Sequence, residues 1–183
     1  ERMGIWAKEN NLAYHLDGAR VFNAMVAQGE SPEQYGAIFD SISICLSKGL
    51  GCPVGSLILG TKDFIKQAKR VRKKFGGGWR QAGFLAAAGI YALDNHVERL
   101  AEDHAKAKRL AEALQKASFV KEVIAPETNI VIFKVEDGNA VIQKFLENNI
   151  SIIAMANNML RMVTHLDVSE EQIDQTIQII ESI

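Results

Sequence analysis

Residues 41–56 read Ser41-Ile-Ser-Ile-Cys-Leu-Ser-Lys-Gly-Leu-Gly-Cys-Pro-Val-Gly-Ser56, an apolar run that leads into a lysine and a loop of glycines. Ile42, Ile44 and Leu46 alternate with smaller residues, and this pattern predicts a short buried strand over 41–47. Such a strand delivers Lys48 to its C-terminal edge, where open α/β sheets bind their ligands. The loop after the lysine is rich in glycine, so its backbone can adopt conformations that a side chain would block.

Lys48 follows a mostly apolar strand rather than a charged face, which makes it a candidate Schiff-base nucleophile. The alternative is an ordinary surface lysine at the end of a strand. This stretch by itself does not decide between the two interpretations.

The composition is that of a globular protein without a strong charge preference. The 183 residues carry a formal net charge of −1, which argues against bulk attraction to nucleic acid or to an anionic membrane. No apolar run approaches the roughly 20 residues that a membrane-spanning helix needs. The two cysteines, Cys45 and Cys52, have no partners at metal-ligand spacing, so we expect neither a disulfide framework nor a metal site. We therefore expect a cytoplasmic location, where thiols stay reduced.

The chain is expected to be the C-terminal piece of a longer polypeptide, because residues 1–10 have the pattern of the middle of an amphipathic helix. Residues 1–117 predict an α/β domain with a mostly parallel sheet, and residues 118–183 predict a small α+β domain. In the first domain we expect strands and helices over the following ranges: helix 1–10, strand 12–16, helix 19–27, a helix from Ser31, strands 41–47 and 54–59, helix 62–74, helix 84–93 and helix 97–117. In the second we expect strands 129–135, 150–155 and 160–165, helix 139–147, and a last helix after the capping box at 169–172.

Two of these helices invite a functional interpretation. Helix 62–74 is strongly basic, but no aromatic residues interleave its charges, so a solvated face or a subunit contact is favoured over a nucleic-acid site. Helix 84–93 is rich in alanine, and we expect it to lie deep in the core.

Two further polar residues are expected at the sheet edge that carries Lys48. Asp17 ends the strand predicted before it, and Arg20 lies one turn along on the same side of the following helix. Parallel strands end at the same edge, so the three side chains are expected to face one pocket. A lysine that forms a Schiff base and an aspartate that keeps a pyridine nitrogen protonated suit pyridoxal phosphate chemistry. Asp17 alone is better explained as a turn residue and Arg20 alone as a surface charge, whereas the three residues together favour a cofactor site.

Four segments strongly resemble the low-specificity L-threonine aldolases, which are fold type I pyridoxal phosphate enzymes. They are His15-Leu-Asp-Gly-Ala-Arg-Val-Phe-Asn-Ala24, Ser47-Lys-Gly-Leu-Gly-Cys-Pro-Val-Gly-Ser56, Gly76-Gly-Gly-Trp-Arg-Gln-Ala-Gly83 and Leu160-Arg-Met-Val-Thr-His165. The resemblance covers essentially the whole chain. It implies that residues 1–117 are the C-terminal part of a fold type I large domain, and that about 150 residues of the subunit precede them.

The resemblance also implies roles for individual residues. Lys48 would bind the cofactor covalently and Asp17 would pair with its pyridine nitrogen. Arg20 and Arg161 would bind the α-carboxylate of an amino acid, since a guanidinium can donate two parallel hydrogen bonds to a carboxylate. Arg80, in the glycine loop, is expected near a subunit interface and the cofactor phosphate.

The implied activity is retro-aldol cleavage of a β-hydroxy-α-amino acid to glycine and an aldehyde, in a homodimer or homotetramer. Another reaction on the same scaffold, such as β-elimination or hydroxymethyl transfer, stays open. So does a non-catalytic assembly module with a vestigial site. His15 and His165 are interpreted as structural.

Overall fold

The computed structural model describes residues 2–183 and divides the chain into two compact units, the first ending at Glu98 and the second comprising Arg99–Ile183. The units divide after residue 98, whereas a boundary after residue 117 was expected. Helix α6 (Leu100–Lys116) packs against β4 (Val120–Ile124), β5 (Ile130–Val135) and α8 (Glu170–Ser182), so it belongs to the C-terminal unit. The polar outer face of α6 gave no indication of which sheet its apolar face would meet.

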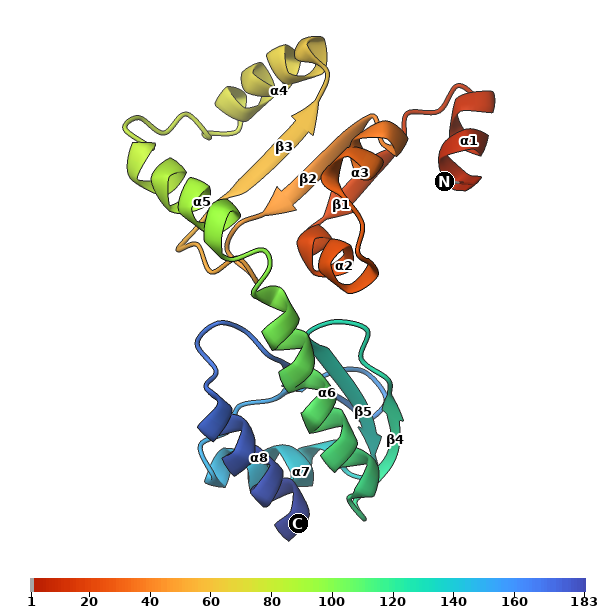
Figure 1. The fold of residues 1–183 in the computed structure, drawn as a ribbon, viewed down its shortest axis with the longest axis vertical. Helices are drawn as coiled ribbons and strands as arrows, with labels where there is room; N and C mark the ends of the chain where they lie inside the picture. The colour runs from red at the N-terminus through yellow and green to blue at the C-terminus, as the bar shows by residue number, and fades with distance from the viewer. Residues whose placement is uncertain (1) are drawn as a thin grey trace. The chain divides into compact units, whose positions relative to one another are not determined.

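The N-terminal unit holds a three-stranded sheet in the order β1-β2-β3, whose strands lie side by side in Figure 1. Its elements are α1 (Arg2–Glu9), β1 (His15–Gly18), α2 (Val21–Gln28), α3 (Pro32–Ile38), β2 (Ser41–Cys45), β3 (Ser56–Gly60), α4 (Lys62–Lys74) and α5 (Gly83–Asn95). Strands β1 and β2 are parallel, as predicted, but β3 runs antiparallel to β2. The sheet is thus mixed rather than mostly parallel, because a loop without a crossover helix joins β2 to β3.

Three predicted helix caps of this unit are confirmed. The Ser31 amide donates to Gln34 Oε1 at 2.7 Å, which closes the capping box before α3. The Thr61 hydroxyl accepts from the Phe64 amide and starts α4. Gly29, with φ 67°, ends α2 in the left-handed conformation that glycine adopts without strain.

The core of the N-terminal unit lies on one face of the parallel strand pair. Val21 and Met25 of α2 pack against Ile42 and Ile44 of β2. A Cβ on Gly18 would come within 2.6 Å of the Ser43 carbonyl oxygen, so glycine is required where β1 approaches β2.

The expectation that α5 lies deep in the core is wrong. Phe84, Ile90 and Tyr91 are 89%, 62% and 61% exposed, and only Gly89 and Ala92 are buried. Small residues do allow close packing, but within this unit only one face of α5 meets a partner.

The C-terminal unit contains a four-stranded antiparallel sheet in the order β4-β5-β7-β6. Helix α7 (Gly138–Glu147) and the strands β6 (Ile153–Ala154) and β7 (Met159–Val163) complete it. Strand β6 is shorter than predicted. Strand β4 was not predicted, because Lys121 and Glu122 interrupt the apolar pattern of an edge strand.

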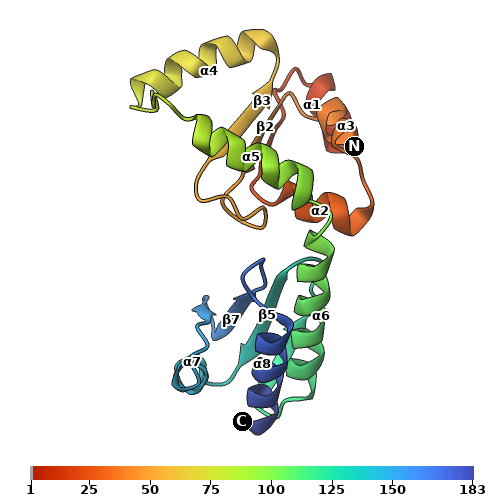
Figure 2. The ribbon, with the colours of Figure 1, turned by 60° about the vertical axis from the view of Figure 1, so that its left-hand side comes forward.

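Helices α6 and α8 lie alongside each other in the C-terminal unit, as Figure 2 shows. The predicted stripe of Leu100, Ala107, Leu110 and Leu114 is buried, which confirms the period of α6. Among residues 2–183, no helix combines the length and the apolar character needed to cross a membrane.

Two adjacent residues of α7 provide a direct test of this core. Phe145 is fully buried and its ring packs against Phe119, whereas Leu146 is 54% exposed. We expect Phe145→Ala to lower the free energy of unfolding by about 3–5 kcal/mol. The matched variant Leu146→Ala should cost less than about 1 kcal/mol, because it leaves no cavity. Denaturant unfolding of the two variants measures the difference, and equal losses would contradict the described packing.

Candidate active site

The strand pair β1–β2 has one apolar and one polar face. Residues paired in register point to the same side of a sheet, and side chains alternate along each strand. Leu16 pairs with Ile42 and faces the core, whereas Asp17 pairs with Ser43 on the opposite face. The polar face also carries His15, Ser41 and Cys45, and the His15 ring bonds the Ser41 hydroxyl at 2.8 Å. A polar sheet face that continues to the strand ends is suited to hold a polar ligand.

Lys48 lies at the carboxyl end of this polar face. Its side chain is exposed, and the ammonium Nζ donates to the Cys45 sulfur at 3.4 Å. Because Cys45 and Asp17 share the polar face, the amine of Lys48 reaches back to the side of the sheet where the carboxylate lies. The structure therefore brings Lys48 and Asp17 to one face and one edge of the sheet, as the sequence predicts.

The loop that holds Lys48 is closed by its own backbone. The Leu46 amide donates to the Gly55 carbonyl at 2.9 Å, and the Cys52 amide donates to the Leu46 carbonyl at 3.1 Å. Inside this ring the Gly51 amide donates to the Lys48 carbonyl at 2.8 Å, with Gly51 at φ 72°. The lysine thus stands on a turn with a fixed backbone rather than on an open strand end.

Asp17 and Arg20 flank the start of α2. One oxygen of Asp17 accepts the Ala19 amide at 3.2 Å, which is the turn bond that an ordinary structural aspartate would make. Arg20 is half-buried and precedes the first residue of α2. Within residues 2–183, neither side chain forms an ion pair, and neither does Lys48. Three unpaired charges on adjoining segments leave capacity for a charged ligand.

The other two predicted residues are not brought to this place by the N-terminal unit. Arg80 is exposed in the loop before α5. Arg161 lies in β7 of the C-terminal unit, so the structure does not join it to Asp17, Arg20 and Lys48. Its Nε is buried and has no hydrogen-bond partner among the described residues. A buried guanidinium N–H without a partner is costly, and a bound carboxylate would satisfy it.

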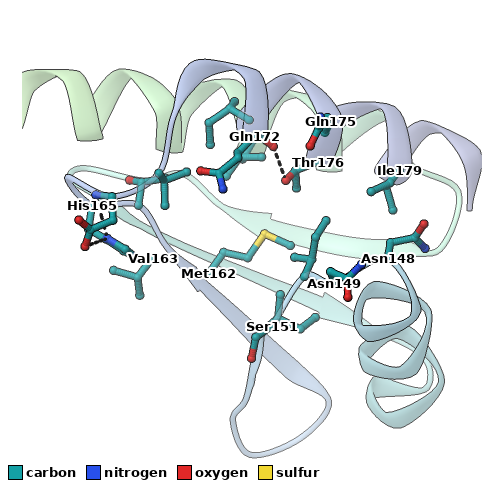
Figure 3. A pocket seen from close by; sticks show the side chains of 17 residues that line it. Asn148, Asn149, Ser151, Met162, Val163, His165, Gln172, Gln175, Thr176 and Ile179 are labelled. Carbon is teal, nitrogen blue, oxygen red and sulfur yellow. Dashed lines mark hydrogen bonds and ion pairs between the residues drawn. The ribbon is translucent and has the colours of Figure 1, made fainter.

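A cavity of about 540 Å³ in the C-terminal unit has few ionisable or nucleophilic side chains in its lining (Figure 3). Amides, hydroxyls and aliphatic side chains line most of it, and none of the predicted site residues does. His165 at its rim accepts the Asp167 amide at 3.3 Å, so the ring shapes the turn before α8. The interpretation of His165 as structural agrees with this contact. No cluster of His, Cys, Asp or Glu suited to a metal ion occurs in the part of the chain that the structure describes.

Cys45 belongs to the site, and sequence reasoning missed it. The signal was present, since Ser41, Ser43 and Cys45 alternate with Ile42 and Ile44 along β2. That alternation distinguishes a polar face from an apolar one, and it places the sulfur on the side of Asp17.

Comparison with known proteins identifies the family of the chain. The family described as Beta-eliminating lyase matches residues 1–138, and the chain belongs to this family. Over 168 residues the chain is 49% identical to the low specificity L-threonine aldolase of Escherichia coli K12, covering 92% of the chain and 50% of that protein. It is 40% identical over 183 residues to low-specificity L-threonine aldolase 1 of Arabidopsis thaliana, covering 97% of the chain and 51% of the relative.

Solved structures show the same fold at low sequence identity. Leishmania major threonine aldolase matches with a TM-score of 0.78 at 18% identity, covering 98% of this chain and 54% of the other. The histidinol-phosphate aminotransferase of Clostridium acetobutylicum matches with a TM-score of 0.70 at 17% identity, covering 99% of this chain and 57% of the aminotransferase. The predicted fold type I is thereby confirmed. The chain spans about half the length of the curated relatives, and its place as the C-terminal portion stays a prediction.

The two cysteines are expected to differ in reactivity. Cys45 is half-buried beside Lys48, whereas Cys52 is buried, and burial raises the pKa of the Cys52 thiol. A raised pKa means less thiolate, and the thiolate is the species that an alkylating reagent attacks. At about pH 8, iodoacetamide should therefore modify Cys45 at least about tenfold faster than Cys52. Peptide mass spectrometry over time measures both rates, with the unfolded protein as the control in which the difference disappears. Faster modification of Cys52 in the folded protein would contradict the described loop.

Proposed function

We propose that the protein is a pyridoxal phosphate-dependent lyase that cleaves L-threonine and L-allo-threonine to glycine and an aldehyde by a retro-aldol reaction. The observation that carries the proposal is the pair Lys48 and Asp17, which share one polar sheet face and one edge. The names of relatives that are 40–49% identical support the choice of reaction.

The residues present fit the cofactor. Pyridoxal phosphate has an aldehyde, which needs an amine, and a pyridine nitrogen, which needs a carboxylate to stay protonated. Lys48 is exposed, and its amine contacts only a thiol among the bonds described for it. Asp17 uses one oxygen in its turn bond, which leaves the second oxygen available. When bound, pyridoxal phosphate takes up the electron pair that Cα retains when the Cα–Cβ bond breaks.

Each residue then has a definite task. Lys48 Nζ would hold the cofactor at its aldehyde carbon, with the aldehyde oxygen lost as water, and Asp17 would keep the ring nitrogen protonated. Arg20 and Arg161 bind the substrate carboxylate, and the unpartnered Nε of Arg161 is the group that gains most from this contact. Arg80 is assigned to the cofactor phosphate. The arginines orient the amino acid, and orientation is what selects the bond that breaks.

The remainder of the subunit and a second copy are proposed to complete the site. Strand β3 is exposed along its whole length, with Leu57, Ile58 and Leu59 between 41% and 44% exposed. Together with the exposed aromatic residues of α5, this is more apolar surface than a finished soluble domain leaves in water. A homodimer or homotetramer would bury it, as expected from the sequence. The cytoplasmic location stays a prediction.

A second candidate function is β-elimination, which the description of the matching family favours. The two reactions differ in products, since an aldolase releases glycine and an aldehyde from threonine, whereas a β-eliminating lyase releases a keto acid and ammonia. Assays of the intact enzyme with threonine, phenylserine and serine separate them. Hydroxymethyl transfer would show as serine turnover that depends on a folate acceptor.

Lys48 supplies the decisive test of the proposal. In the intact enzyme, Lys48→Ala should remove the visible absorbance of the lysine-bound cofactor and lower threonine cleavage by at least about 10³-fold, because no other amine holds the cofactor. The matched control is Lys62→Ala, at an exposed lysine that begins α4. It should leave the absorbance and the rate unchanged. Retention of both signals in Lys48→Ala would exclude this role for Lys48.

A further inference from the structure

We propose that His96 is a positioning residue for Lys48, which clamps the loop 46–55 to α5 so that the lysine amine stays on the polar sheet face. This inference rests on the proposed function of Lys48. Among residues 2–183, no described hydrogen bond joins His96 to the lysine or to the sheet, and we infer that it acts through the loop backbone.

The central contact joins His96 to Leu50, two residues after the lysine. The ring nitrogen Nδ1 lies 2.7 Å from the Leu50 carbonyl oxygen. A carbonyl only accepts, so Nδ1 carries the hydrogen, and this holds for the neutral ring and for the imidazolium. Leu50 is 3% exposed, so its carbonyl lies in a sheltered place where a missing hydrogen bond is costly.

The histidine is held in turn by its own surroundings. Its amide donates to the Ala92 carbonyl at 2.8 Å and closes the last turn of α5. The ring of Tyr91 packs edge-on against the imidazole, with centroids 5.4 Å apart and planes at 87°. The imidazole is therefore a fixed donor rather than a mobile surface group.

Two further contacts hold the same loop against α5. The Cys52 thiol donates to the Ala88 carbonyl at 3.6 Å. Leu46 Cδ1 packs on Gly89, where a Cβ would come within 3.2 Å of it. The three contacts fall on both sides of Lys48 along the loop.

The clamp explains the composition of α5. Ala88, Ala92 and His96 are spaced four residues apart and form one stripe along the helix, with Gly89 beside it. This stripe is the side of α5 that the unit buries, with Ala92 1% exposed. Small residues bring the helix close to the loop, and His96 at the end of the stripe supplies its strongest hydrogen bond.

A small displacement of the loop is expected to matter for catalysis. Reacting groups that are misplaced by about 1 Å lose on the order of 10²-fold in rate. The Gly51 amide bonds the Lys48 carbonyl, so a shift of the segment after Leu50 is transmitted to the lysine through the turn.

The test compares three variants of the intact enzyme. His96→Phe keeps a ring against Tyr91 but removes the donor, and His96→Asn keeps a donor on a shorter side chain. Asn95→Ala is the matched control, because in the described contacts the side-chain amide of Asn95 donates a hydrogen bond only to the Tyr91 carbonyl of its own helix. All three are examined for folding by circular dichroism.

The first readout is hydrogen–deuterium exchange of the loop 46–55 in protein freed of cofactor. We expect His96→Phe to raise the exchange of this loop at least about threefold, while His96→Asn and Asn95→Ala stay near wild type. The second readout is kinetic. His96→Phe should lower kcat for threonine by about 10–10²-fold with KM changed less than about threefold, and His96→Asn should recover most of the loss.

Wild-type exchange and kcat in His96→Phe would overturn the inference. If His96→Phe does not fold, His96→Ala takes its place: the same loss of kcat and gain of loop exchange are expected, and wild-type values of both would overturn the inference. A wild-type enzyme that neither binds cofactor at Lys48 nor cleaves threonine would refute the proposed function instead. The exchange readout would then still decide whether His96 holds the loop.

Discussion

The structure of the site depends on the register of one parallel strand pair. Asp17 lies opposite Ser43, and a shift of one residue would turn Asp17 into the core and Leu16 out of it. The register is fixed from both sides. Ile42 and Ile44 are buried against α2, and Gly18 allows β1 to approach the Ser43 carbonyl more closely than any other residue could. The amphipathic strand pair thus separates a hydrophobic core from a face that carries a carboxylate, a thiol and a lysine.

The loop after β2 converts this register into a position for Lys48. Its backbone bonds close it on itself, and the small-residue stripe of α5 holds it from outside. The lysine is exposed and mounted on a rigid frame, which is the combination that a covalent cofactor link requires. In the C-terminal unit, the buried Nε–H of Arg161 has no hydrogen-bond partner in residues 2–183, so it too is available to a ligand.

Local signals in the sequence predicted much of this structure. The capping residues Ser31 and Ser169 and the apolar period of α6 are short-range features, and the structure confirms them. Asp17 and Lys48 were expected at one sheet edge because parallel strands end together, which is a rule of topology.

The remainder depended on partners that lie far along the chain. The alanines of α5 predict close packing but not how many faces are packed, and the apolar stripe of α6 does not state which sheet it meets. The antiparallel direction of β3 and the edge strand β4 have only weak local signals. The role of His96 was invisible, because a contact across 46 residues leaves no local pattern.

The proposed site depends most directly on Lys48 as the residue to which the cofactor binds. Borohydride reduction of the intact enzyme makes the bond between lysine and cofactor permanent, and peptide mass spectrometry then identifies the modified residue. We predict a pyridoxyl group on the peptide that contains Lys48. A pyridoxyl group confined to another lysine, such as those of α4, with Lys48 unmodified, would contradict it.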